Sequence, residues 1–336
     1  MSSFIRNIFR KLTGAGLRPA PQVYVAAFGK HPGWNDHIDD PGLESQRLVA
    51  LKRVLYVQGV AGNIDSGAWE RLGEQNQVPG FHHLVLCQCE QDSIVARLWS
   101  SSDGKGRTRY PMIVAIQGSD LPLESVVDLA LPALEECEAA CTATRDAAAV
   151  RALIDETRRR LRGELLGGAA EAPPKDEPSS LGWLAARPEM GQDQRGLLLV
   201  LYQVEREMAA FRPGAQADRM IASGSRHMRV PACADSPQQV LKVWARFLAE
   251  ELDPAAPRMI ILPLGHGWVD LIVGEPTVSQ LFCMRATPRS IPLTTDIPYT
   301  LEESFVARMR KRIGTATTQA TAAETGPAAA EVHSQA

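Results

Sequence analysis

Runs of apolar residues, broken by glycine, proline and polar positions, divide the first half of the chain into short predicted strands. Such runs are typical of β-strands, and they occur at residues 23–28, 81–89, 93–99 and 110–117. Between the first two, residues 43–60 carry apolar side chains at helical spacing. We therefore expect an α/β (α+β) protein whose N-terminal part is a mainly antiparallel four-stranded sheet with flanking helices.

After residue 120 the apolar residues recur at helical spacing, and the second half again predicts both helices and strands. Residues 123–166 are alanine-rich and interrupted at Pro132, which removes an amide donor, so two or three helices are predicted there. The second half predicts helices at 194–211, 237–252 and 301–313 and strands at 258–263, 268–273 and 280–285. This order echoes the first half, so a degenerate repeat is an open hypothesis.

The clearest change in composition lies at residues 168–180, which are rich in proline and charge. A segment of this kind docks poorly and is typical of a boundary between domains, each with its own core. The resulting division is an amphipathic segment and linker at 1–20, an α/β domain at 21–167, the linker at 168–180, a second smaller α/β domain at 181–313 and a disordered tail at 314–336.

The loop after the first strand holds the most varied side chains of the chain. Gly29, Pro32 and Gly33 prevent the strand from continuing. Loops fixed at the end of a strand are common sites of function. A second polar segment, residues 100–109, is predicted as a flexible basic hairpin. The candidate partner-binding residues are Lys30, His31, Trp34, Asn35, Asp36, His37, Lys105, Arg107, Arg109 and Tyr110.

The same loop contains ligand types for a transition metal, namely His31, Asp36, His37, Asp39 and Asp40. Their spacing matches no known metal signature. The cysteine pairs Cys87/Cys89 and Cys137/Cys141 lie among apolar residues and are interpreted as core side chains. We expect no catalytic constellation, metal site or cofactor; the alternative is a metal-dependent hydrolase that uses the loop.

Charge and cysteine content narrow the class of protein. The chain has 336 residues, with 36 Lys+Arg against 39 Asp+Glu and a net charge of −3, so no attraction to nucleic acid is expected. Six cysteines without a secretory signal favour reduced thiols and a cytoplasmic location. Residues 4–12 form a basic amphipathic pattern that can lie on an anionic membrane surface, so peripheral attachment to the inner membrane is an alternative to docking on protein.

Two motifs carry a resemblance to a known family. Residues 28–32 read Phe-Gly-Lys-His-Pro, with Asp36 shortly after, and residues 106–112 read Gly-Arg-Thr-Arg-Tyr-Pro-Met. They resemble the Phe/Tyr-Gly-Lys-x-Pro opening and the Gly-Arg-x-Phe-Pro-Leu strand entry of the TagF/ImpM family, proteins associated with bacterial type VI secretion. The resemblance covers roughly residues 23–160. The chain departs from the family where it reads Gly-Trp-Asn-Asp-His instead of a Gly-Asp-Phe element.

The resemblance implies a non-enzymatic accessory protein that regulates secretion by protein–protein binding. Relatives act as posttranslational repressors of secretion assembly and are connected with forkhead-associated scaffold proteins. The implied partners are therefore components of the secretion machinery.

Overall fold

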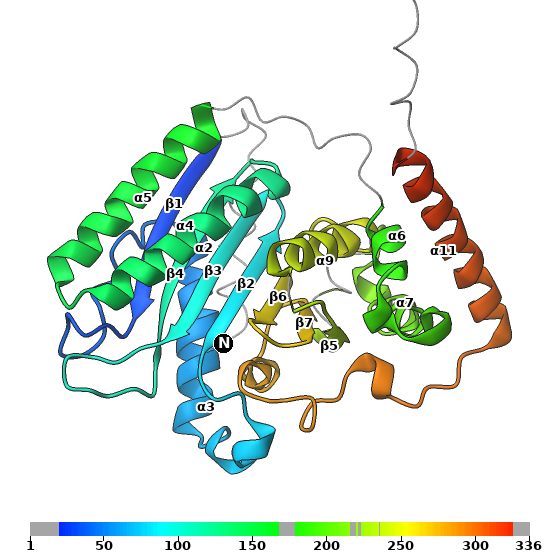
Figure 1. Cartoon of the computed structure of the whole chain (residues 1–336), viewed down its shortest axis with the longest axis horizontal. Helices are drawn as coiled ribbons and strands as arrows, with labels where there is room; N and C mark the ends of the chain where they lie inside the picture. Colours follow the sequence, from blue (N-terminus) through cyan, green and yellow to red (C-terminus); the bar gives the residue numbers. More distant parts are fainter. Residues whose placement is uncertain (1–19, 168–178, 216–219, 221–222, 235, 325–336) are drawn as a thin grey trace, which may run out of the picture.

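The computed structural model describes residues 20–167, 179–215, 220, 223–234 and 236–324. Its centre is a seven-stranded antiparallel sheet in the order β1-β4-β3-β2-β6-β7-β5 (Figure 1). The strands are β1 Gln22–Gly29, β2 His82–Cys89, β3 Asp92–Ser100, β4 Pro111–Ser119, β5 Arg226–Pro231, β6 Arg258–Pro263 and β7 Trp268–Val273. The mixed α/β class is confirmed.

The four strands expected from the first half lie side by side, but the sheet continues beyond them. Strand β2 pairs with β6, so that Leu84 lies opposite Leu262 and Leu86 opposite Ile260. The expectation of a separate sheet in each half is wrong, because this pairing joins positions far apart in the sequence. Residues 168–178 of the proposed linker lie outside the described residues, and its last residue, Ser180, begins a helix.

Both faces of the sheet are buried, which explains why the strands read as nearly continuous apolar runs. Side chains of a strand alternate between its faces. In β1, Val23, Val25 and Ala27 therefore join one core cluster, whereas Ala26 and Phe28 join the other.

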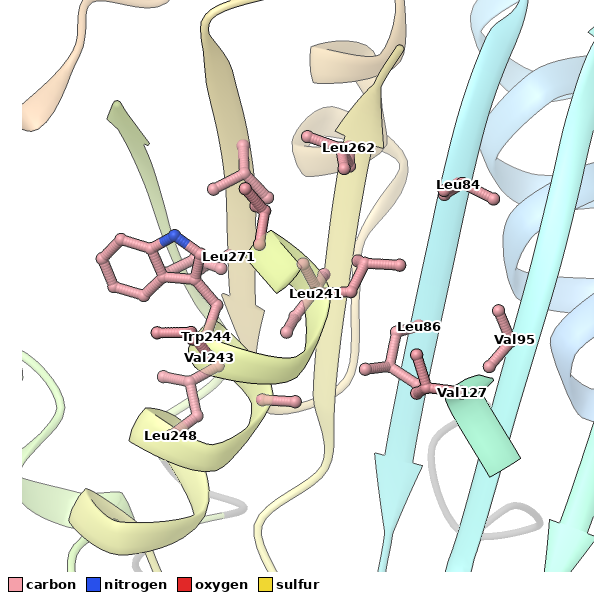
Figure 2. Close-up of a cluster of buried hydrophobic side chains, with 14 of the residues drawn as sticks. Leu84, Leu86, Val95, Val127, Leu241, Val243, Trp244, Leu248, Leu262 and Leu271 are labelled. Carbon is pink, nitrogen blue, oxygen red and sulfur yellow. The ribbon is translucent and has the colours of Figure 1, made fainter. Parts of the chain in front are cut away.

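Helices from both halves of the chain share the core cluster of the first face. These helices are α4 Leu123–Ala143, α5 Ala147–Gly167, α6 Ser180–Ala185, α7 Arg195–Arg206, α9 Pro237–Glu251 and α11 Glu303–Glu324. Of these, α4, α5 and α9 lie on the sheet and the others pack outside α9. Figure 2 shows Leu86 of β2 and Val127 of α4 in the same cluster as Leu241 and Trp244 of α9. The expectation that each half has its own core is therefore wrong for the described residues.

The second face is covered by α2 Gln46–Leu51, the π-helix η1 Lys52–Ala61 and α3 Gly62–Asp65, and by an irregular segment from the second half. That segment contains α10 Val278–Leu281 and the 3₁₀ turn η7 Phe282–Met284. Further 3₁₀ turns are η2 Glu70–Leu72, η3 Glu74–Asn76, η4 Pro188–Met190, η5 Gln192–Gln194, η6 Ala209–Phe211 and η8 Thr294–Asp296.

The predicted strand at 280–285 is wrong, since these residues form the end of α10 and η7. Thr277 accepts a hydrogen bond from the Gln280 amide, while the Gln280 side chain accepts one from the Thr277 amide. This reciprocal capping box starts a helix and outweighs the strand-like apolar residues that follow.

Two further helix expectations need correction. Helix α4 continues through Pro132, and Leu131 and Leu134 on either side of it are buried in the core. The region forms two helices, as predicted, but the break lies at residues 144–146. Helix α11 runs to Glu324, so residues 314–324 of the expected tail are helical. Residues 1–19, with the amphipathic pattern at 4–12, and residues 325–336 lie outside the described residues. No helix of the described part combines the length and apolar character needed to cross a membrane.

Candidate binding site

The two polar segments singled out by sequence meet at one corner of the sheet, where β1 ends beside the start of β4. Gly29 lies opposite Met112, and the Lys30 amide donates to the Pro111 carbonyl at 3.1 Å. Gly29 has a φ of +113°, and a Cβ there would lie 2.2 Å from the Pro111 carbonyl oxygen. Glycine is therefore required by both conformation and space.

The loop after Gly29 turns back onto the edge of β1. The Ile38 amide donates to the Gly29 carbonyl at 2.9 Å, and Lys30 forms an antiparallel bridge with His37. The side chain of Ile38 is buried in the core. The loop is therefore a closed excursion whose ends are fixed by the sheet.

Asp103 is the buried centre of the corner, at 2% exposure. Its Oδ1 accepts the Lys105 and Arg107 amides at 3.0 and 3.1 Å. Its Oδ2 accepts Lys30 Nζ at 2.9 Å and Arg107 Nε at 2.6 Å. Desolvation opposes ionisation of this carboxyl, but the bonds from Lys30 and Arg107 outweigh it and hold its pKa well below the usual range. The hairpin at 100–109 is thus tied to the loop, contrary to the expectation that it is flexible.

Asp36 carries this buried network to the surface. Its side chain is 68% exposed, yet its Oδ1 lies 2.5 Å from Lys30 Nζ, 3.1 Å from His37 Nδ1 and 3.2 Å from Arg107 Nη2. The hydrogen bond from Lys30 is the main reason that the pKa of Asp36 is lowered. Asp36 therefore stays ionised and presents a negative charge beside the exposed Arg107 guanidinium.

Aromatic rings support the exposed part of the corner. His37 packs edge-on against Tyr56 and Tyr110, with ring centroids 5.7 and 5.5 Å away. Lys30 Nζ lies 6.0 Å from the Tyr110 centroid. Burial, and then the Lys30 charge, lowers the pKa of His37, so the ring is neutral near pH 7.

Hydrogen bonds between the loop and the hairpin complete the corner. The Gly104 amide donates to the Trp34 carbonyl at 2.6 Å, and Arg107 Nη2 donates to the Asn35 carbonyl at 3.0 Å. A Cβ on Gly104 would lie 2.9 Å from the Asn35 side-chain oxygen. The two segments therefore form one continuous surface, which we call the Lys30 corner and define as residues 30–37 and 103–110.

The candidate residues occupy three levels of this corner. The exposed ones are Asn35, Asp36, His37, Lys105, Arg107 and Arg109. Trp34 and Tyr110 are half-buried. Lys30 and His31 are buried, at 3% and 1% exposure, so they support the surface from below and cannot contact a partner directly.

The buried position of His31 also argues against the loop as a metal site. Its Nε2 bonds the Cys141 carbonyl at 2.9 Å, and its Nδ1 accepts the Gly33 amide at 3.0 Å. Both ring nitrogens are therefore engaged. Within the described residues, the loop histidines and aspartates form no group of three converging ligands.

Sequence reasoning missed one residue of the corner and three residues that contact it from outside. They are Asp103, Tyr56, Asp65 and Glu70. Glu70 pairs with Arg109, and Asp65 accepts a bond from the Tyr110 hydroxyl at 3.4 Å. The one available signal was Asp103 followed by glycine, a combination that favours a turn with the aspartate bonded to amides two and four residues on.

No protein-family model and no curated protein matches the chain. A search of solved structures finds the crystal structure of PA0076 from Pseudomonas aeruginosa PAO1, with a TM-score of 0.29 and 17% identity. The match covers 45% of this chain and 64% of the length of PA0076.

Proposed function

We propose that this protein is a non-enzymatic regulator of a bacterial type VI secretion system and acts by binding another protein through the Lys30 corner. The observation that carries the proposal is the junction of the two TagF/ImpM-like motifs. They are more than seventy positions apart in the sequence, yet Lys30 of the first and Arg107 of the second share the carboxylate of Asp103.

The chemistry of the corner supports binding rather than catalysis. Lys30 donates to two carboxylates and both ring nitrogens of His31 are bonded, so neither serves as a nucleophile or general base. The exposed side chains instead offer a mixed surface of amide, carboxylate, imidazole and guanidinium groups beside half-buried Trp34. Polar groups held by buried partners are preorganised, which lowers the entropic cost of binding.

The proposed partner is a component of the secretion machinery, with a forkhead-associated scaffold protein as the first candidate. The proposed mode of action is posttranslational repression of assembly. In this arrangement the buried Lys30–Asp103 pair sets the shape of the corner, and Asp36 and Arg107 provide the contacts.

A secretion assay in the parent bacterium tests the proposal. Raised levels of the chain should lower type VI secretion, and the charge reversals Asp36→Lys and Arg107→Glu should each relieve the repression. Arg159→Glu is the matched control, because Arg159 is exposed on α5 and pairs with Glu156 of the same helix. Secretion that responds neither to raised levels nor to deletion of the gene would refute the proposal.

A further inference from the structure

A second polar cluster lies on the other half of the sheet, between β5, β7 and η7. His227 and Arg229 come from β5, Asp270 from β7 and Cys283 from η7. Arg229 lies directly opposite Asp270 in the antiparallel pairing, and His227 is two positions along the same face. Two rigid strands and a short helical turn thus bring an imidazole, a carboxylate and a thiol together.

The three potential ligand atoms converge. One atom each from His227, Asp270 and Cys283 lies within 4.8 Å of the other two, and His227 Nε2 is 2.8 Å from Asp270 Oδ1. A tetrahedral zinc ion with nitrogen, oxygen and sulfur ligands separates these atoms by about 3.2–3.8 Å. The positions found therefore need only small side-chain adjustments to surround an ion.

We propose that His227, Asp270 and Cys283 bind a zinc ion through one nitrogen, one oxygen and one sulfur. This donor set suits Zn²⁺, since imidazole and thiolate exclude magnesium and calcium, which prefer oxygen ligands. Three protein ligands leave one position for water or an external anion. The site is separate from the Lys30 corner and uses none of its residues.

The positive charge of Arg229 repels a bound cation, but the hydrogen bonds of Arg229 leave a lone pair of Asp270 available to coordinate a metal. Its Nε and Nη2 donate to Asp270 Oδ1 and Oδ2, both at 2.8 Å, and Nη1 and Nη2 donate to the Ala286 and Cys283 carbonyls. A carboxylate oxygen has two lone pairs, so Oδ1 can accept Arg229 on one and coordinate a metal on the other. The arginine then acts as an outer partner that orients the ligand.

Metal binding displaces one proton, that of the thiol. Without metal, His227 Nε2 donates a hydrogen bond to Asp270 Oδ1 at 2.8 Å. With zinc bound to Nε2, the imidazole carries its proton on Nδ1 instead. A cysteine binds zinc as the thiolate, so the Cys283 thiol has to lose its proton when the ion binds. Formation of the Zn–S bond releases that proton to solvent, about one proton per ion.

Access to the site comes from the side of His227. Asp270 and Cys283 are buried at 1% and 2% exposure, while the His227 side chain keeps 15% of its surface exposed. An ion can therefore meet the imidazole first and then displace the proton of the thiol.

Cobalt substitution tests the site on the full chain without a histidine tag. After chelation and removal of bound metal, Co²⁺ should produce a thiolate-to-cobalt charge-transfer band that saturates at about one ion per chain and disappears on addition of Zn²⁺. Cys283→Ser should abolish the band. His227→Gln, at the most exposed of the three ligands, should weaken Co²⁺ binding on the order of a hundredfold or more, because loss of a direct ligand costs at least as much as loss of an outer partner.

Cys89→Ser is the matched control, because Cys89 is a partly buried thiol outside the cluster. It should leave the band unchanged. Absence of the band in the unmodified chain, or a band that Cys283→Ser retains, would overturn the proposal. If Cys283→Ser does not fold, the affinity of His227→Gln decides, since unchanged Co²⁺ binding there also excludes the site.

Discussion

Each half of the sheet is held by a buried ion pair, and the two pairs differ in what surrounds them. Asp103 and Lys30 are both buried, but Lys30 also bonds Asp36 and Asp103 also bonds Arg107, and the side chains of Asp36 and Arg107 are 68% and 52% exposed. Arg229 and Asp270 are 0% and 1% exposed, and the other bonds of Arg229 go to buried backbone carbonyls. The first pair opens onto solvent and the second is closed. We infer that the open pair serves recognition and the closed one holds the irregular segment at 282–291 against the sheet.

Removal of the closed pair should give the largest effect. Asp270→Asn leaves the Arg229 guanidinium buried without a counter-charge, which costs about 3–5 kcal/mol of unfolding free energy. Urea unfolding followed by circular dichroism measures the loss. Asp155→Asn, at an exposed position on α5, is the control and should stay within about 0.5 kcal/mol of the unmodified chain. Equal effects at both positions would show that Asp270 is not a closed counter-ion.

A buried histidine beside the closed pair should dominate the acid sensitivity of the fold. Burial lowers the pKa of His83 to about 4 from 6.5. The unfolded chain therefore binds more protons between pH 6.5 and 4, and the free energy of unfolding falls by up to about 1.4 kcal/mol per pH unit as the pH drops through this range. Below about pH 4 both states are protonated at His83 and its contribution is fully lost.

His83→Gln should remove that slope in unfolding experiments run at several pH values. His37→Gln is the comparison from the open corner, where the ring is 46% exposed, and it should change the slope much less. The reverse ranking of the two variants would contradict the contrast between the closed and open regions.

Gly29→Ala should lower the stability of the protein by straining the backbone at the Lys30 corner. The substitution places a methyl group against the Pro111 carbonyl in a positive-φ conformation, and we expect a loss of about 2 kcal/mol or more. Gly106→Ala shares the positive φ but has open space around the added Cβ, so it should cost only about 1 kcal/mol. Thermal melts of the two variants separate crowding from conformational strain; indistinguishable melts would mean that the close approach is absent.

The smallest effect on stability is expected at the exposed end of the corner. Asp36→Asn should leave the melting temperature unchanged within error, because Lys30 keeps Asp103 as its partner. Affinity for the proposed partner, a forkhead-associated scaffold protein, should nevertheless fall about tenfold or more when measured by calorimetry, because a charged contact is lost. A lower melting temperature with unchanged affinity would assign Asp36 a structural role.

The sequence correctly predicted strands whose side chains are all buried, because burial produces a continuous run of apolar residues. The range 258–263 was predicted as a strand and forms β6, because each of its side chains is buried and apolar residues therefore run together. Strand β5 was not predicted. Its face with His227 and Arg229 is polar, and Arg229 is buried there only because Asp270 and the carbonyls of Cys283 and Ala286, distant in sequence, accept its bonds. The pairing of β2 with β6 was also invisible, as the local pattern carries no information on distant partners.

The sequence predicted where the candidate site lies along the chain, but not which of its side chains are buried. The sequence indicated the loop and the hairpin as polar segments, and the structure joins them. The loop pattern predicts Lys30 and His31 as contact residues, as charged and polar side chains are mostly exposed. Both side chains are buried, since Asp103 neutralises the charge of Lys30 and the Cys141 carbonyl accepts a hydrogen bond from the His31 ring. A degenerate repeat in the second half stays a prediction.

The pairing of β2 with β6 also has a consequence for synthesis of the chain on the ribosome. His83 pairs with Pro263, 180 positions later, so β2 emerges long before the strand that covers its second edge. At about 5–20 residues per second, that edge waits roughly 9–36 s. An uncovered apolar strand in the middle of the future sheet can recruit other nascent chains. Premature termination between the two strands should therefore yield aggregated rather than soluble fragments, and a chaperone that holds the nascent first half should raise the yield of the complete protein.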